Sequence, residues 1–228
     1  ALGLSAVTIC SQLPVFAAEE TAQATDTAAQ PQTADPSVVT TNGIDGWPQA
    51  SDISSTAAIV METSTNTVLY SKNADQALYP ASAVKVMTCL VALENSSLDD
   101  QVTMTATGVS GVTDGGANIS SQLDEVFTME QCLYAIMVAS ANDIALQVAE
   151  HVGGSVDAFV QTMNARAQEL GCTNTVFTNP TGLPDENQHT TAHDMALIME
   201  AAMANETFRT IAATTSYTLP ATNVSGGE

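Results

Sequence analysis

Positively charged side chains are scarce in this chain of 228 residues: its lysines and arginines are Lys72, Lys85, Arg166 and Arg209. Against 25 Asp and Glu residues, they leave a formal net charge of −21 at pH 7. This balance excludes nucleic-acid binding through basic patches, because counterion release needs Lys and Arg side chains that face phosphates. It also argues against docking on anionic lipid through this part of the chain. Hydrophobic residues make up 45% of the sequence, which excludes a disordered acidic tail.

Cysteine is also rare, with Cys10, Cys89, Cys132 and Cys172 the four present. Cys10 falls in a predicted leader segment, and the odd number that remains does not suggest a disulfide framework. Cys89 and Cys132 lie in apolar helical patterns, where a buried thiol acts as a small hydrophobic side chain. No Cys-x-x-Cys spacing occurs, so a cysteine metal site is not expected.

The N-terminal part divides into two segments of different composition. Residues 1–18 carry no charge and end on small residues in the pattern of a signal-peptidase site, which predicts a signal peptide without its basic n-region. A buried apolar strand or helix is the alternative. Residues 19–50 are rich in Ala, Thr, Gln and Pro and carry acids without bases, which predicts an extended acidic linker. We therefore expect an extracytoplasmic domain over residues 51–228 and no membrane-spanning run after the leader.

The folded segment begins with strand patterns and continues with helical ones. The runs 57–61 and 67–70 flank Thr63-Ser64-Thr65-Asn66 and predict a hairpin. Helices are predicted from about residue 82 to 94, over 128–139, from 142 to about 153, from 155 to 170 and over 192–204. The first of these is apolar nearly all round, which predicts a central, buried helix.

The predicted fold class is α/β, with a helical cluster packed on an antiparallel sheet. The strand count is low for this class, since one hairpin cannot cover a buried helix. Residues 217–219 are expected to begin another strand, and we expect further C-terminal strands beyond Glu228.

The pair Ser82 and Lys85 combines a hydroxyl and an amine three residues apart at a helix start. At this spacing the side chains share a helix face. A serine needs a base to become a nucleophile, and a lysine can be that base only when desolvation or a neighbouring cation leaves its amine neutral. The surroundings of Lys85 are apolar, which favours a desolvated amine. The alternative is an N-cap serine followed by a solvated lysine.

A second pair of polar residues, Ser140 and Asn142, lies at a break between two apolar helical patterns. A hydroxyl and an amide on a short loop can relay a proton and hold a substrate carbonyl. The alternative is an ordinary helix end and restart, with Asn142 as the N-cap.

Three stretches together resemble the D-alanyl-D-alanine carboxypeptidase family of low-molecular-weight penicillin-binding proteins. YPASAVKVMTCLVALE is similar to the family's S-x-x-K motif, VASANDIALQVAEHVGGS to its S-x-N motif, and FTNPTGLPDENQHTTAHDMALI to the segment that follows. The resemblance covers about residues 55–220 and keeps the family's order. It implies a β-lactamase and DD-peptidase-like fold whose sheet begins with a hairpin.

The resemblance also implies a role for each of four residues. Ser82 would form the acyl-enzyme with the penultimate D-Ala of a peptidoglycan stem peptide, and its backbone N–H would be half of an oxyanion hole. Lys85 would be the general base. Ser140 would take part in proton transfer, and Asn142 would hydrogen-bond the substrate amide. β-Lactams would be inhibitors, and no metal or cofactor is implied.

The family's third motif, Lys-Thr-Gly, does not occur in this sequence. The resemblance places that motif after the second one, so we expect it, and any C-terminal membrane anchor, beyond Glu228. On this expectation the 228-residue chain alone is inactive and its parent protein is the enzyme.

Several other readings remain open at this point. A DD-endopeptidase or a class A-like β-lactamase would use similar chemistry, although Ala141 stands where the β-lactamase motif has Asp. A non-catalytic wall-binding or sporulation-associated relative, or a secreted adhesive module, would not use Ser82. His189 and His193 are expected to be surface histidines, and Asp185 and Glu186 to form a turn.

Overall fold

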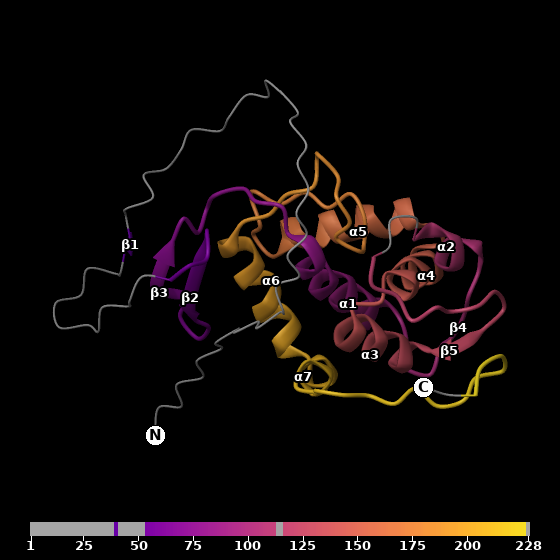
Figure 1. The fold of residues 1–228 in the computed structure, drawn as a ribbon. Coiled ribbons are helices and arrows are strands. Elements are labelled where there is room, and N and C mark those ends of the chain that lie inside the picture. The colour runs from indigo at the N-terminus through magenta and orange to yellow at the C-terminus, as the bar shows by residue number, and fades with distance from the viewer. Residues whose placement is uncertain (1–38, 41–52, 113–115, 227–228) are drawn as a thin grey trace. The chain divides into compact units, whose positions relative to one another are not determined.

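The structure is a computed structural model of the chain, and it describes residues 39–40, 53–112 and 116–226. The chain divides into two compact units, Ala1–Ala74 and Asp75–Glu228, which are described separately (Figure 1). The predicted signal peptide lies outside the described residues, and so does the predicted linker apart from Val39 and Thr40.

The first unit contains a small antiparallel sheet in the order β1-β3-β2. Its strands are β1 (Val39–Thr40), β2 (Ala58–Glu62) and β3 (Thr67–Lys72), and β2 and β3 form the predicted hairpin. The Glu62 carboxylate accepts hydrogen bonds from the backbone N–H groups of Ser64 and Thr65 and from the Thr65 hydroxyl. These bonds favour the ionised carboxylate and lower the pKa of Glu62 to about 2. The turn that joins the strands is therefore tied to the last residue of β2.

The second unit is mainly helical. Its elements are the 3₁₀ turn η1 (Ala81–Ala83), α1 (Val84–Asn95), β4 (Gln101–Thr103), α2 (Ala106–Gly111), β5 (Val126–Thr128), α3 (Met129–Ala139), α4 (Asn142–Gly153), α5 (Val156–Glu169), α6 (Ala192–Ala204) and α7 (Glu206–Ala212). β4 and β5 form an antiparallel pair. Residues 84–92 of α1 are all buried, and α1 contacts α3, α4, α5, α6 and α7 (Figure 1). The predicted central, buried helix is confirmed.

Polar side chains cap the starts of α3, α5 and α6. Thr128 accepts a hydrogen bond from the Gln131 backbone N–H while the Gln131 side chain reaches back to the Thr128 N–H, which is a complete capping box. The hydroxyl of Ser155 caps α5, the helix predicted from residue 155. Thr191 caps α6 by accepting a hydrogen bond from the Asp194 backbone N–H, without the reciprocal side-chain bond of a full capping box.

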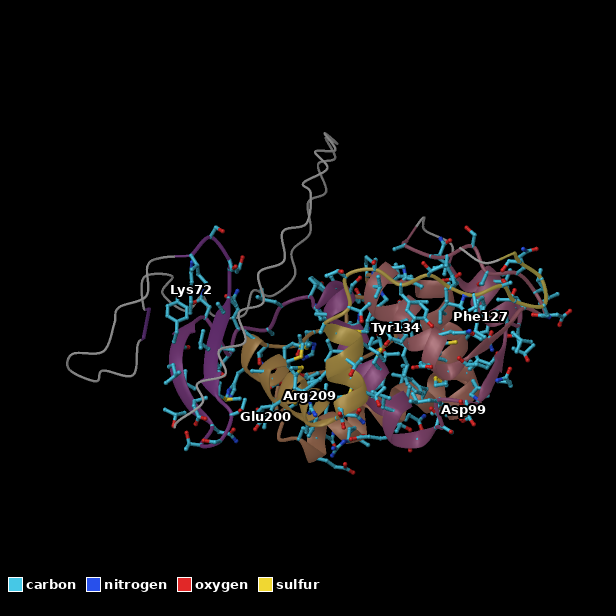
Figure 2. The ribbon with its side chains drawn as sticks, turned by 90° about the horizontal axis from the view of Figure 1, so that it is seen from below. Lys72, Asp99, Phe127, Tyr134, Glu200 and Arg209 are labelled. Atoms are coloured by element: carbon cyan, nitrogen blue, oxygen red, sulfur yellow. The ribbon has the colours of Figure 1, made fainter. Side chains whose placement is uncertain are left out.

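The carboxylate of Asp194 instead accepts hydrogen bonds from the Asn174 backbone N–H and the Thr175 hydroxyl. It therefore ties the loop before α6 to the start of that helix. At the other end of α6, Arg209 of α7 donates to the carbonyls of Met203 and Ala204 (Figure 2). A cation at a helix C-terminus satisfies carbonyls that lack intrahelical partners.

The prediction of a strand beginning at residues 217–219 is wrong, because these residues form no regular secondary structure. The Tyr217 ring stacks on Tyr134 of α3 with centroids 4.0 Å apart and nearly parallel planes. In this part of the chain a ring contact with a helix, rather than a strand partner, therefore holds the backbone.

Sulfur-containing side chains fill much of the core. Cys89, Cys132 and Cys172 are buried free thiols, which confirms the prediction for the first two. Met87 and Met163 are fully buried among the aliphatic residues of the same core. Within the described residues, no helix combines the length and the apolar character that crossing a bilayer requires.

Candidate active site

The structure brings three of the predicted site residues into hydrogen-bonding distance. The Lys85 amine lies 3.3 Å from the Ser82 hydroxyl, and the Ser140 hydroxyl lies 3.1 Å from the same oxygen. Ser82 and Ser140 are 58 positions apart in the chain. The two motifs that the sequence presents separately therefore meet at the Ser82 oxygen.

The position of Ser82 follows from the way α1 begins. Ser82 lies in η1, and α1 continues from Val84, so the chain enters the helix through one 3₁₀ turn. Side chains three residues apart at a helix start lie on the same face, which places Ser82 beside Lys85. The backbone at Ala81 has a positive φ of 47°. Ser82 is exposed whereas Lys85 is only 3% exposed, so an accessible hydroxyl is paired with a buried amine.

Burial of Lys85 changes its acid–base behaviour. Desolvation lowers the pKa of the Lys85 amine to about 8, and a weaker interaction with Cys89 opposes this shift. The amine also donates to the backbone carbonyl of Thr181 at 2.6 Å. A neutral amine held by this carbonyl has its lone pair free for the Ser82 hydroxyl proton. The apolar helix thus gives Lys85 the property that the sequence analysis required of a base.

Ser140 occupies a special backbone position. It is the C-cap of α3 and has a left-handed conformation with φ of 57° and ψ of 32°, while its backbone N–H donates to the Ala135 carbonyl. The left-handed residue ends α3 and lets α4 begin at Asn142. This break between the two helices is where the Ser140 hydroxyl reaches Ser82.

Asn142 is the first residue of α4 rather than its N-cap, which is Ala141. The helix-capping alternative for Asn142 is therefore wrong. Its backbone N–H donates to the Ala117 carbonyl at 2.8 Å, and its side chain is buried. Its side-chain oxygen is a buried acceptor without a hydrogen-bond partner among the described residues. An unpaired buried acceptor is costly in the folded state, so this oxygen is suited to receive an N–H donor from a ligand or a moving side chain.

The residue after Asn142 fixes the loop beside it. The Asp143 carboxylate accepts hydrogen bonds from the Ser121 hydroxyl at 2.7 Å and from the Ser121 backbone N–H at 3.1 Å, with a longer one from Ile119. Asp143 is buried, and these donors offset the cost of its burial. The loop of residues 117–121 is thereby held against the start of α4. Sequence reasoning did not assign this role, because the partners are 22 or more positions away.

The turn formed by residues 179–183 is the other part of the site that sequence reasoning missed. It supplies the Thr181 carbonyl to Lys85, and its Pro180 carbonyl accepts a hydrogen bond from the Thr88 hydroxyl at 2.7 Å. Gly182 has a φ of 82°, and a Cβ there would overlap the carbonyl oxygen of Ala81. The Asn-Pro-Thr-Gly sequence signals a turn. Its contact with α1 could not be foreseen, because it joins positions more than 90 residues apart.

The other polar residues that the sequence analysis weighed lie elsewhere in separate contacts. His189 is hydrogen-bonded through its ring to the Asn187 carbonyl, whereas the ring of His193 contacts the Asp75 carboxylate at 3.1 Å. Asp185 accepts a hydrogen bond from the Asn187 backbone N–H, as expected of a turn. In the part of the chain that the structure describes, no cluster of three His, Cys, Asp or Glu side chains is arranged to hold a metal ion.

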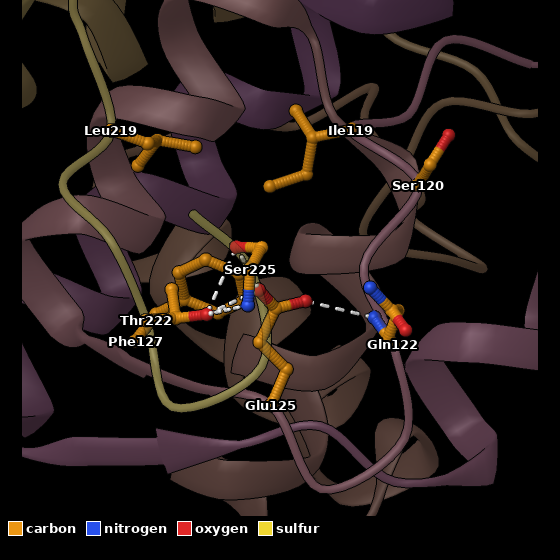
Figure 3. Close-up of a pocket in the computed structure, with 8 residues that line it drawn as sticks. All are labelled: Ile119, Ser120, Gln122, Glu125, Phe127, Leu219, Thr222 and Ser225. Atoms are coloured by element: carbon orange, nitrogen blue, oxygen red, sulfur yellow. Dashed lines mark hydrogen bonds between the residues drawn. The ribbon is translucent and has the colours of Figure 1, made fainter. Parts of the chain in front are cut away.

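A small cavity of about 70 Å³ is lined by eight residues, among them Ile119 and Glu125 (Figure 3). Its wall contains the Glu125 carboxylate, which accepts hydrogen bonds from the hydroxyls of Thr222 and Ser225 and from the Gln122 backbone N–H. These bonds lower the pKa of Glu125 against the opposing effect of burial. Because its acceptor positions are occupied by protein donors, Glu125 joins residues 222–225 to the segment before β5.

Comparison with known proteins agrees with the geometry at Ser82. Residues 45–224 match the family model described as D-alanyl-D-alanine carboxypeptidase. The chain belongs to this family. The resemblance inferred from the three sequence stretches is confirmed, and so is the fold class.

Individual relatives and solved structures support the assignment. The chain is 37% identical over 155 residues to the D-alanyl-D-alanine carboxypeptidase DacF of Bacillus subtilis, across 66% of this chain and 39% of DacF. It is 36% identical over 170 residues to DacB2 of Mycobacterium tuberculosis, across 72% of this chain and 56% of DacB2. The chain thus spans between about two fifths and three fifths of the length of these relatives.

Solved structures show the same fold. The crystal structure of a D-alanyl-D-alanine carboxypeptidase from Mycobacterium tuberculosis H37Rv superposes with a TM-score of 0.73 at 32% identity, covering 81% of this chain and 68% of that one. A variant of the Streptomyces K15 DD-transpeptidase gives a TM-score of 0.74 at 30% identity, covering 78% of this chain and 73% of that one.

Proposed function

We propose that the protein is a serine D-alanyl-D-alanine carboxypeptidase that removes the terminal D-Ala from peptidoglycan stem peptides. The observation that carries the proposal is the convergence of Lys85 and Ser140 on the Ser82 oxygen within a chain that belongs to this family. Its substrate is a stem peptide that ends in D-Ala-D-Ala, and β-lactams are its covalent inhibitors. Such substrates place its action outside the cytoplasmic membrane.

Acylation begins at Ser82. The neutral Lys85 amine takes the hydroxyl proton as the Ser82 oxygen attacks the carbonyl carbon of the penultimate D-Ala. The tetrahedral intermediate collapses by breaking the peptide bond, and the departing D-Ala amine receives a proton. Ser140 lies within reach of the Ser82 oxygen and is suited to pass that proton on. Water then hydrolyses the ester and returns Ser82 to its starting state.

Two further groups act on the substrate rather than on protons. The backbone N–H of Ser82, in the η1 turn that leads into α1, stabilises the negative charge that develops on the carbonyl oxygen. Asn142 orients the substrate amide. The buried side-chain oxygen of Asn142, which lacks a partner among the described residues, supports this role because a substrate N–H would satisfy it.

The proposal is tested by covalent labelling of the full-length protein with a fluorescent penicillin. We expect label on wild-type protein and none on Ser82→Ala, because the acyl bond forms on the Ser82 oxygen. Ser110→Ala is the matched control, since it removes an exposed hydroxyl on α2. Labelling that persists in Ser82→Ala, or its absence from folded wild-type protein, would refute the proposal.

A DD-endopeptidase is the second candidate, favoured by one group of relatives. The D-alanyl-D-alanine endopeptidase of Escherichia coli is 31% identical over 152 residues, across 66% of this chain and 48% of that protein. Both activities use the same acyl-enzyme, so penicillin labelling does not separate them. Release of D-Ala from a stem pentapeptide identifies the carboxypeptidase, whereas cleavage of a cross-linked dimer without D-Ala release identifies the endopeptidase.

A further inference from the structure

We propose that Asn179 is a positioning residue for Lys85, acting through the turn of residues 179–183 that presents the Thr181 carbonyl to the Lys85 amine. The inference deepens the proposed function and rests on it for the catalytic meaning of Lys85. Asn179 itself makes no described contact with Ser82 or Lys85, so its effect must pass through the turn.

The Asn179 side chain holds the turn from within. Its oxygen accepts hydrogen bonds from the backbone N–H groups of Thr181 and Gly182, at 3.2 and 2.8 Å, and from the Thr181 hydroxyl at 2.9 Å. Its amide nitrogen donates to the Leu183 carbonyl at 3.1 Å. One side chain thus fixes the backbone on both sides of the peptide group whose carbonyl faces Lys85.

The turn is also anchored from outside. The buried Gln188 side chain accepts from the Asn179 backbone N–H at 3.2 Å and donates to the Leu183 carbonyl at 3.3 Å. The Thr88 hydroxyl, one turn after Lys85 on α1, donates to the Pro180 carbonyl at 2.7 Å. Lys85 and Thr88 therefore contact two successive carbonyls of the same turn, which sets the register between α1 and residues 180–181.

The consequence for Lys85 is a defined direction for its amine. A neutral amine has two N–H bonds and one lone pair, and the Thr181 carbonyl at 2.6 Å takes one N–H. The amine is held against this turn. If the turn became less rigid, water would reach the amine, and mobile water molecules would replace the fixed Thr181 carbonyl as its acceptor. Admitted water would reverse part of the desolvation that lowers the pKa of Lys85 to about 8.

Other charges near Lys85 do not compete with this effect. The titratable residue with a described influence on Lys85 is Cys89, whose own pKa burial raises to about 12, so it remains a neutral thiol near pH 8. The residues of the turn, 179–183, are Asn, Pro, Thr, Gly and Leu, and none of them titrates. If substitution of Asn179 shifts the pKa of Lys85, the shift must therefore come from a change in the conformation of the turn.

The experiment measures the pKa of the Lys85 amine in the full-length protein by competitive trace acetylation at a series of pH values, read by mass spectrometry. Lys72, on the hairpin, is the internal reference. We expect Asn179→Ala to raise the pKa of Lys85 by about one unit toward its ordinary value. We expect the pH profile of penicillin acylation to shift upward by the same amount, with a lower rate at pH 7.

Asn164→Ala is the matched control for a structural loss. Asn164 of α5 also clamps backbone, since it donates to the Phe177 carbonyl at 2.7 Å and accepts from the Phe177 N–H at 2.8 Å, two residues before the turn. Asn164→Ala should lower the free energy of unfolding without shifting the titration of Lys85 or the pH profile of penicillin acylation. Thr88→Val, which removes the bond to the Pro180 carbonyl, is the second test variant if Asn179→Ala does not fold, and it should shift the same pKa in the same direction.

The inference is overturned if the acetylation pKa of Lys85 in Asn179→Ala, or in Thr88→Val where that variant is used, equals that of Asn164→Ala. The acetylation result does not depend on penicillin. A wild-type protein that fails to react with penicillin would refute the proposed function, while the acetylation comparison would still decide the role of Asn179.

Discussion

Burial of Lys85 lowers the stability of the folded chain while it makes the amine easier to deprotonate. Lys85 is 3% exposed, and desolvation lowers the pKa of its amine to about 8. Because burial disfavours the protonated amine, Lys85 lowers the free energy of unfolding at pH 7. In the unfolded chain the same protonated amine is fully solvated. The same shift leaves a useful fraction of neutral base near physiological pH.

Lys85→Met tests this balance through stability. The pKa of Lys85 falls from 10.5 to about 8 on folding, so the folded protein binds fewer protons and wild-type stability rises with pH between these values. Over this window the free energy of unfolding of wild type should rise relative to Lys85→Met by about 3 kcal/mol. Urea unfolding of both proteins at pH 7.5, 9 and 10.5 measures the difference, and parallel pH curves would contradict it.

At the scale of elements, the contact between α1 and the 179–183 turn depends on a residue without a side chain. Gly182 has a φ of 82°, and a Cβ there would overlap the Ala81 carbonyl oxygen and lie 2.9 Å from the Ser82 nitrogen. The turn can approach the start of α1 only because this position is glycine.

Gly182→Ala should therefore destabilise the protein by about 2–4 kcal/mol, from backbone strain and from displacement of the turn. Gly171→Ala is the matched control, because Gly171 has a φ of 84° but no atom within 4 Å of the built Cβ. Gly171→Ala introduces backbone strain without a steric overlap and should lower the free energy of unfolding by about 1 kcal/mol. Chemical denaturation compares the two; equal losses would show that the close approach to Ala81 has no energetic importance.

Prediction from the sequence succeeded where the signal is local. The hairpin, the apolar α1 and the helix over residues 128–139 depend on patterns of neighbouring residues, and the structure confirms them. The short elements β4, α2, β5 and α7 were not predicted, because glycines and short lengths leave no periodic pattern. The strand expected at residues 217–219 failed for the opposite reason: its β-forming residues are held by stacking on Tyr134.

The candidate site divides in the same way. The spacing of Ser82 and Lys85 at one helix start predicted their contact. The break between two apolar helical patterns predicted the position of Ser140. The Thr181 carbonyl could not be predicted, because a backbone acceptor leaves no mark on residue type. The Asp143 anchor was missed since its partners lie on a glycine-flanked loop without a pattern of its own.

At the scale of the whole molecule, each of the four cations has a defined contact despite the net charge of −21. Arg166 of α5 forms a two-nitrogen ion pair with Glu94 of α1 and also contacts Glu169. Arg209 holds the end of α6, Lys72 donates to the Ile53 carbonyl, and Lys85 lies in the site. The core, in contrast, depends on apolar burial, which includes three thiols.

The thiols provide a test of cooperativity across the second unit. Cys89, Cys132 and Cys172 lie on α1, on α3 and after α5, and burial raises the pKa of each; for Cys89 and Cys172 it reaches about 12. Buried neutral thiols react slowly with Ellman's reagent. In a Cys10→Ser variant, all three should react together as urea unfolds the protein. A thiol that reacts quickly without urea would show that its surroundings open independently.

The left-handed backbone of Ser140 has an evolutionary consequence. The conformation with φ of 57° is one that glycine adopts more easily than serine, so folding alone would accept a glycine at this helix end. Such a replacement would leave α3 and α4 in place while removing the hydroxyl from beside Ser82. Selection acting on stability alone would therefore tolerate the loss of this hydroxyl, whereas the proton transfer proposed for Ser140 requires it.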